Sequence, residues 1–189
     1  MEKKYFFFDI DEPIHYSLET ANIPYIEIES KDINSEIMMC AIQNISAKYI
    51  IYSGYGGYIL KSELFQLNKK FIHIHAGILP QYRGSTTVYY SYLDDKTMGA
   101  TAIFLNEKID EGEMILQEKF YLCNEEIIPN VDYIYDPYIR SKVLIKVLKK
   151  YSEEKCLTSK IQETKDANTY YIIHPLLKHI ALLGMEINH

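Results

Sequence analysis

The sequence contains no tryptophan and only three cysteines among its 189 residues. Cys40, Cys123 and Cys156 are odd in number and form no C-x-x-C pair, which argues against a disulfide framework and against a zinc site built from cysteines. No apolar run approaches the roughly 20 residues that cross a bilayer. Asp9 and Asp11 interrupt the apolar stretch near the start, so we expect neither a membrane span nor a signal peptide. The expected location is a reducing cytoplasm.

Positive charge is also scarce, with 20 Lys and Arg against 26 Asp and Glu, and a net charge of −6. Nucleic-acid binding depends on clustered basic side chains, so extended contact with RNA or DNA is not expected. The rest of the composition, 48% hydrophobic and 24% charged, is typical of a globular domain. The length fits a single domain.

The hydrophobic pattern predicts strands that alternate with helices. We expect strands at residues 4–10, 25–29, 49–52, 71–75, 99–105 and 114–122, and helices or helical turns at 16–21, 35–45, 61–67, 85–93, 139–151 and 174–183. This alternation implies an α/β fold with a mostly parallel sheet and helices on both of its faces. The last two strands are close enough in sequence to form an antiparallel edge.

Two histidines stand at the end of the predicted strand 71–75, where α/β sheets bind their ligands. His73 and His75 are two residues apart, so their side chains leave the strand on the same face. A loop rich in glycine and proline follows, which favours a functional role. H-x-H is also a metal-ligand pair, but a metal site needs three or four protein ligands. The remaining histidines do not complete one, so we expect no metal.

Three other motifs are weaker. DEGE at residues 110–113 and GYGG at 54–57 are each typical of ordinary turns, and the glycine spacing misses the dinucleotide fingerprint G-x-G-x-x-G. FFFDID at residues 6–11 resembles the hydrophobic strand and D-x-D of the haloacid-dehalogenase phosphatases. It continues with Glu12 and Pro13 instead of that family's Gly-Thr, so a phosphatase is not favoured.

The central segment is more specific. FIHIHAGILPQYRG at residues 71–84 resembles the signature of the folate-dependent formyltransferases, roughly I-N-x-H-x-S-L-L-P-x-Y-R-G. IDEGEMILQ at residues 109–117 is similar to that family's L-D-T-G-D-I-L-x-Q, and MGAT at residues 98–101 is similar to its T-G-V-T.

Further motifs occur on either side. YGGYIL at residues 55–60 resembles the Y-G-x-I-L that walls the family's folate pocket, and Gln162 with TYY at 169–171 resembles the Q…T-Y-Y that closes the catalytic domain. The resemblance covers residues 49–122 well and extends loosely to Tyr171.

The resemblance implies a Rossmann-like formyltransferase domain over residues 1–171, with a shortened first βα unit, followed by a C-terminal helical tail at 172–189. It implies transfer of a formyl group from N10-formyltetrahydrofolate, as co-substrate and without a metal, to a primary amine. By motif position, His75 matches the catalytic histidine and Asp110 the catalytic aspartate, while His73 occupies the asparagine position. We expect His75 and His73 to donate hydrogen bonds to the oxyanion, and Asp110 to orient or charge His75 and help remove a proton.

The same resemblance implies two sets of binding residues. Formylfolate is expected at Tyr55, Gly56, Gly57, Ile59, Leu60, Ile109, Glu111 and Gly112. The amine substrate is expected at Ala76, Gly77, Tyr82 and Arg83.

The motif Tyr82-Arg83-Gly84 bears on the substrate class within this family. It is closer to the corresponding motif of the initiator-tRNA and amino-sugar enzymes than to the F-K-G that is usual in the purine-pathway enzyme. A tRNA enzyme normally adds a basic C-terminal barrel, whereas this chain is acidic and ends soon after Tyr171. We expect a small-molecule amine, with a nucleotide-linked amino sugar for surface polysaccharide or lipopolysaccharide as the leading candidate, and neither nucleic acid nor membrane as partner.

Two alternatives stay open: a hydrolase that releases formate from formylfolate, and a non-catalytic folate-binding domain. The amphipathic tail at residues 174–183 either packs on its own core or contributes to a homodimer contact.

Overall fold

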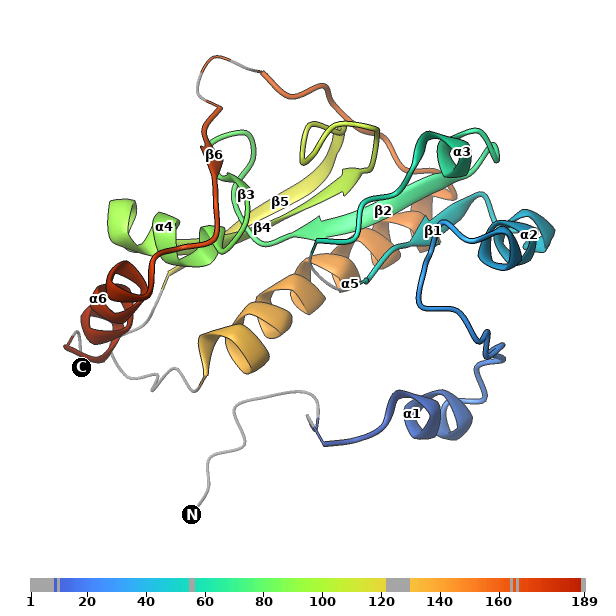
Figure 1. The fold of residues 1–189 in the computed structure, drawn as a ribbon, viewed down its shortest axis with the longest axis horizontal. Coiled ribbons are helices and arrows are strands. Elements are labelled where there is room, and N and C mark those ends of the chain that lie inside the picture. The colour runs from blue at the N-terminus through green and yellow to red at the C-terminus, as the bar shows by residue number, and fades with distance from the viewer. Residues whose placement is uncertain are drawn as a thin grey trace. The chain divides into compact units, whose positions relative to one another are not determined.

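The computed structural model describes residues 9, 11–54, 57–121, 130–163, 165 and 167–187, which belong to two compact units, Met1–Ser46 and Ala47–His189. In the first unit, helices α1 (Ile14–Thr20) and α2 (Glu36–Asn44) confirm the two helices predicted there (Figure 1).

The two strands predicted in the first unit have different outcomes. The strand predicted at residues 25–29 is wrong, because this stretch forms no ladder with any described segment. Alternation of polar and apolar residues favours a strand only where a partner supplies hydrogen bonds. The strand predicted at residues 4–10 lies, apart from Asp9, outside the described residues.

The second unit contains a four-stranded sheet in the order β1-β2-β4-β5 (Figure 1). Its strands are β1 (Tyr49–Ile51), β2 (Lys70–His75), β4 (Thr97–Phe104) and β5 (Met114–Tyr121). β1 and β2 are parallel, whereas β2 with β4 and β4 with β5 are antiparallel. The α/β class and the antiparallel pair predicted at residues 99–122 are confirmed. Within this four-stranded sheet, the parallel pairing is that of β1 with β2.

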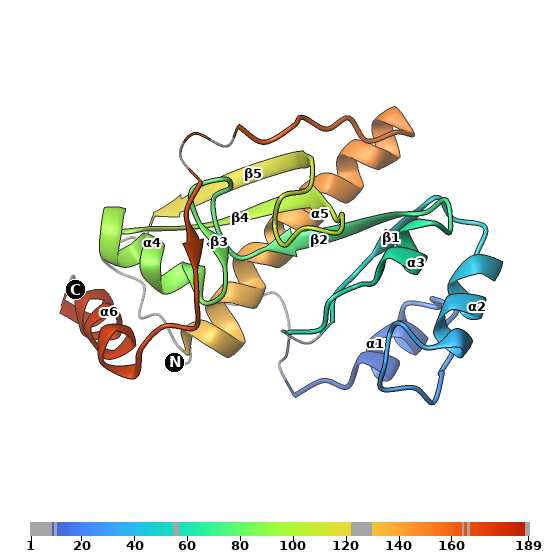
Figure 2. The same cartoon turned by 45° about the horizontal axis from the view of Figure 1, so that its top comes forward.

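The two faces of this sheet are covered differently. Helix α5 (Asp136–Glu154), which follows a short π-helical turn (Val131–Tyr135), runs across one face (Figure 2), and its Val143 and Val147 share a buried cluster with Ile74 of β2. On the opposite face of β4, Ile103 packs with Leu79 from the loop after β2. Where helices were expected on both faces, a loop covers this part of the second face.

Two further helices confirm predicted segments. α3 (Ser62–Phe65) follows β1, and α4 (Thr87–Asp95) precedes β4. Among the described residues, no helix combines the length and apolarity needed to span a membrane.

The C-terminal tail forms helix α6 (Pro175–Ile187), which packs on α4. Its Ala181 and Met185 lie in one buried cluster with Tyr89 and Tyr92 of α4. The tail therefore packs on the core of its own unit, the first of the two interpretations that the sequence left open. The domain boundary at residue 171 stays a prediction.

A short pair of strands connects distant parts of the second unit. β3 (Arg83–Gly84) pairs in parallel with β6 (Thr169–Tyr170), and no sequence pattern predicted this pair. Gly84 has φ +98°, and a Cβ atom there would collide with the carbonyl oxygen of Tyr170. Only glycine fits this close approach. The pair therefore anchors the end of the loop that follows β2.

Candidate active site

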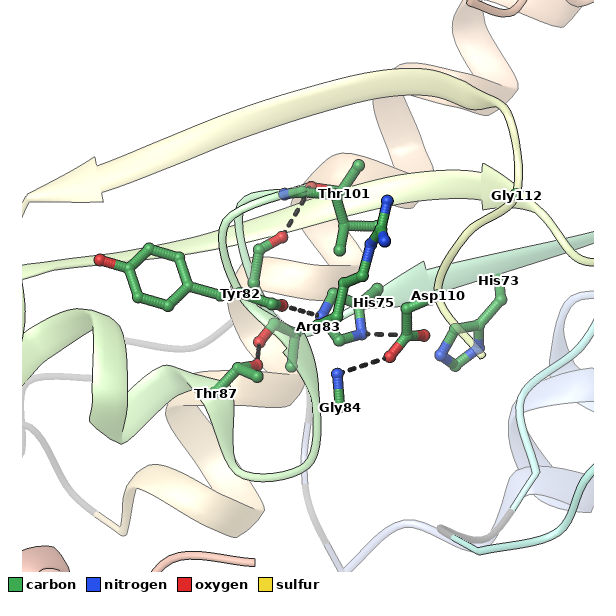
Figure 3. A network of polar contacts seen from close by, with 12 residues as sticks. His73, His75, Tyr82, Arg83, Gly84, Thr87, Thr101, Asp110 and Gly112 are labelled. Atoms are coloured by element: carbon green, nitrogen blue, oxygen red, sulfur yellow. Dashed lines mark hydrogen bonds and ion pairs between the residues drawn. The ribbon is translucent and has the colours of Figure 1, made fainter. Parts of the chain in front are cut away.

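The end of β2 and the turn between β4 and β5 bring together a histidine and an aspartate that are distant in the sequence (Figure 3). His75 Nδ1 lies 3.3 Å from Oδ1 of Asp110, and both residues are buried. The pairing predicted from the motif positions of these two residues is therefore present in the structure.

Both ring nitrogens of His75 face acceptors. While Nδ1 faces the Asp110 carboxylate, Nε2 lies 2.6 Å from the carbonyl oxygen of Tyr82. Neither oxygen can donate, so each ring nitrogen donates when both bonds are formed, and the ring then carries a positive charge. A Cβ at Gly77 would lie 2.8 Å from the Tyr82 carbonyl oxygen and 3.0 Å from His75 Nε2. Gly77 thus allows the loop to close onto the imidazole.

Asp110 is held in an unusual backbone conformation. Its φ of +54° lies in the left-handed region, which is uncommon outside glycine and is often found at functional sites. Its Oδ2 accepts a hydrogen bond of 2.8 Å from the backbone N–H of Gly84. Burial raises the pKa of the Asp110 carboxyl, but the hydrogen bond and charge of His75, the Gly84 N–H and the charge of His73 together hold this pKa below its usual value. Asp110 is therefore ionised at neutral pH.

The Asp110 turn is held from the other side by Gln162. The Gln162 amide nitrogen donates to the carbonyl oxygens of Asp110 at 2.8 Å and Gly112 at 2.7 Å, while its Oε1 accepts from Arg83 Nη2 at 2.9 Å. The side chain is buried, so these bonds are shielded from water. The sequence motif included Gln162 but gave no sign of this role, because spacing alone does not show which polar side chain is buried.

His73 is partly exposed and differs from His75 in its contacts. Its Nδ1 lies 3.3 Å from the carbonyl oxygen of Tyr52, just after β1. Figure 3 shows the Asp110 carboxylate between the rings of His75 and His73. Burial lowers the pKa of His73, and the charges of His75 and Arg140 add to this, outweighing the opposite effects of the Tyr52 carbonyl and Asp110. His73 is therefore neutral at pH 7.

The residues expected to bind formylfolate fall into different environments. Tyr55 and Gly56 lie outside the described residues. Ile59 and Ile109 expose 58% and 60% of their surface, whereas Leu60 is buried in the core. The two isoleucines are thus accessible to a ligand, and Leu60 supports the fold.

The other three residues expected to bind folate also lie in different environments. Gly57 has φ +88° and open space where a side chain would stand. Glu111 lies 3.6 Å from Nη1 of Arg83, and a Cβ at Gly112 would collide with the carbonyl oxygen of Phe104. Glu111 and Gly112 therefore shape the turn that carries Asp110.

The residues expected to contact the amine are engaged within the protein. The Tyr82 hydroxyl donates to Asp94 at 2.7 Å, and Arg83 is buried between Gln162 and Glu111. The carbonyl oxygen of Ala76 accepts a hydrogen bond from Thr87. Contact of Ala76, Gly77, Tyr82 and Arg83 with a substrate stays a prediction.

Two hollows of about 300 Å³ occur in the described part of the chain, and neither is lined by His73, His75 or Asp110. One follows β5 and residues 158–160. The other is lined by Gln81, Tyr82, Asp94, Lys165, Ala167, Asn168 and Tyr170. The described residues contain no group of three or more His, Cys, Asp or Glu placed to hold a metal ion.

Comparison with known families agrees with this geometry. Residues 12–132 match the model of the formyl transferase family. The chain belongs to this family. The resemblance seen in the motifs is thereby confirmed, and His73, His75 and Asp110 all lie inside the matched region of this formyl transferase.

Curated relatives of this formyl transferase include methionyl-tRNA formyltransferases. That of Finegoldia magna is 32% identical over 99 residues, covering 52% of this chain and 32% of the relative. That of Listeria monocytogenes is 34% identical over 111 residues, covering 58% of this chain and 35% of the relative. The chain thus spans about a third of the length of the curated relatives it matches.

Solved structures share the fold of this formyl transferase. A methionyl-tRNA formyltransferase from Clostridium thermocellum has a TM-score of 0.61 at 18% identity, covering 86% of this chain and 67% of that one. A sugar N-formyltransferase from Shewanella has a TM-score of 0.60 at 23% identity, and the match covers 89% of this chain and 70% of that one. The formyltransferase PseJ from Anoxybacillus kamchatkensis has a TM-score of 0.58 at 20% identity, and the match covers 91% of this chain and 82% of that one. That structure is a complex with UDP-4,6-dideoxy-4-formamido-L-AltNAc and tetrahydrofolate. These similarities confirm the predicted Rossmann-like formyltransferase fold.

Proposed function

We propose that this chain transfers the formyl group of N10-formyltetrahydrofolate to a primary amine. The observation that carries the proposal is the buried pairing of His75 with Asp110, next to His73, in a chain that belongs to the formyl transferase family. Each of the three residues stands at a position where the family motif places its reactive groups.

The reaction sets two requirements for the protein. When the amine nitrogen adds to the formyl carbon, the carbonyl oxygen becomes an oxyanion, and the amine gives up a proton as the bond from carbon to N10 breaks. Preorganised positive charge and hydrogen-bond donors stabilise such an oxyanion. When both of its hydrogen bonds are formed, the His75 ring beside Asp110 supplies that charge. A donor hydrogen bond from His75 Nε2 requires the oxyanion to replace the Tyr82 carbonyl as its acceptor.

We assign formylfolate binding to exposed residues of the segment after β1 and of the turn that carries Asp110. Ile59 and Ile109 present exposed apolar side chains, and Gly57 leaves open space for a flat ligand. Burying apolar surface of this kind against a ligand is favourable. The presence of tetrahydrofolate in the PseJ structure is compatible with a folate at a site of this fold.

For the amine we propose a small molecule, with a nucleotide-linked amino sugar as the leading candidate. A net charge of −6 disfavours extended contact with the tRNA backbone. Sugar N-formyltransferases occur among the fold neighbours, while the curated relatives are tRNA enzymes, so methionyl-tRNA belongs in the test. The cytoplasmic location expected from the cysteine usage is part of this proposal.

The test is incubation of the full chain with N10-formyltetrahydrofolate and a panel of nucleotide-linked amino sugars, with methionyl-tRNA as a separate acceptor. Mass spectrometry should find one sugar that gains CO, and Asp110→Asn should abolish the gain. Formate released without any amine would replace the proposal by a hydrolase. Folate binding without turnover on any acceptor would replace it by a non-catalytic domain.

A further inference from the structure

The two histidines at the end of β2 have different amounts of hydrogen-bonding capacity left. In His75 both ring nitrogens are committed, one to Asp110 and one to the Tyr82 carbonyl. Asp110 is committed as well, since its two oxygens contact His75 and the Gly84 N–H. Within this group the nitrogen that remains is Nε2 of His73, to which the described residues offer no hydrogen-bond partner.

The Tyr52 carbonyl decides which tautomer His73 adopts. A carbonyl oxygen only accepts, so the ring nitrogen that contacts it, Nδ1, carries the hydrogen. In a neutral imidazole the other nitrogen then holds a lone pair. His73 Nε2 is therefore an acceptor, and it does not supply the second donor that its position in the family motif suggests.

On the basis of the proposed function, we propose that His73 is the general base that removes the proton from the attacking amine. The lone pair on Nε2 accepts this proton while the amine nitrogen forms its bond to the formyl carbon. The bond from the formyl carbon to N10 then breaks, and N10 takes the proton from Nε2. His73 returns to its neutral form, so atoms and charge balance without a further reactant.

The charged groups around His73 suit this cycle. Four groups act on it: the Tyr52 carbonyl after β1 through a hydrogen bond, and His75 on the same strand, Asp110 from the turn after β4 and Arg140 from α5 through their charges. Burial, His75 and Arg140 keep the resting imidazole neutral and ready to accept. Asp110 and the Tyr52 carbonyl stabilise the cation formed during the reaction. Arg140 is paired with Asp136 at 3.0 Å, which moderates its repulsion of that cation.

The decisive variant is His73→Asn, because an asparagine amide donates a hydrogen bond but cannot hold a proton. A base role predicts that formyl transfer falls by about 100-fold or more. A donor role predicts that the rate is kept or raised. Tetrahydrofolate binding, measured by calorimetry, should remain within threefold of wild type and shows that the variant is folded.

The pH profile separates the two histidines. In the wild type, kcat should fall with decreasing pH along an acid limb below the ordinary histidine value of about 6.5, because protonated Nε2 cannot accept. The limb should be absent from the residual activity of His73→Asn and retained in that of the matched variant His75→Gln. Free imidazole should partly restore the rate of His73→Ala and leave His75→Ala unchanged.

The outcomes are distinct. If the wild type formylates no amine, the proposed function fails and this inference fails with it. If the wild type is active and His73→Asn keeps its rate, or if the acid limb persists in that variant, the base role alone is wrong.

Discussion

The loop after β2 and the segment after β1, to both of which we assign parts of the proposed site, differ in their surroundings. In the first, Arg83 is buried and joined through Gln162 to the turn that carries Asp110. In the second, Gly57 borders open space and Ile59 is exposed. The turn that carries Asp110 is thus held by internal bonds, whereas Gly57 and Ile59, proposed to contact formylfolate, remain at the surface. Precise placement matters most for chemistry, which explains this division.

The largest effect should follow a substitution of Asp110, in the part of the site that internal bonds hold in place. Asp110→Asn removes the charge that pairs with His75, and we expect kcat for formyl transfer to fall by about 1,000-fold. The matched control is Glu118→Gln, the same chemical change in an exposed ion pair with Lys146. It should leave kcat within threefold. A loss of less than tenfold in Asp110→Asn would show that the pairing is structural.

Gln162→Leu should give the next largest effect. It leaves the carbonyls of Asp110 and Gly112 and the Arg83 guanidinium without their buried partner, so we expect the free energy of unfolding to drop by about 3 kcal/mol. Urea denaturation measures the drop. The control is Gln117→Leu, which removes a single hydrogen bond to the Leu79 carbonyl and should cost about 1 kcal/mol. Equal costs for the two variants would contradict the assigned role of Gln162.

Acid should lower the stability of the folded protein through two site residues, His73 and Asp110. The folded-state pKa of His73 is lowered, so the unfolded chain binds more protons and stability falls as pH drops below the ordinary histidine value. The pKa of Asp110 is lowered too, and its contribution is lost as pH falls from its ordinary value through the folded one. Urea midpoints measured between pH 7 and pH 3 should decrease in both windows. His73→Asn should remove only the window nearer neutrality, and an unchanged profile in this variant would disprove the assignment.

The smallest effect is expected from substitutions of the exposed isoleucines Ile59 and Ile109. Ile59→Ala or Ile109→Ala should raise KM for formylfolate about three- to tenfold while leaving the melting temperature unchanged, since each removes only surface apolar contact. Leu60→Ala is the contrasting variant, because this side chain is buried and its truncation should cost about 3 kcal/mol of stability. Unchanged KM in both isoleucine variants would place the folate elsewhere.

Much of the fold and the centre of the site could be predicted from the sequence. Apolar residues predicted the four strands of the sheet and helix α5. The strands β2, β4 and β5 and helix α5 are long enough to show a pattern, whereas β1 has three residues. The motif positions of His75 and Asp110 predicted their contact.

The remaining features depend on contacts between distant residues. The pairing of β3 with β6 involves two residues on each side, too few for any periodicity. A buried amide such as Gln162 resembles a surface one in the sequence, and the acceptor state of His73 depends on the Tyr52 carbonyl, which no motif includes. Residues 25–29 alternate like a strand but pair with nothing described.

Gly84 has a practical consequence for anyone who shortens this protein. The same residue donates its N–H to Asp110 and lies against the Tyr170 carbonyl oxygen. A stop codon placed before Thr169 would remove the neighbour that keeps this peptide group in position, and the damage would reach the carboxylate at the reaction centre. C-terminal truncations should therefore keep Thr169 and Tyr170.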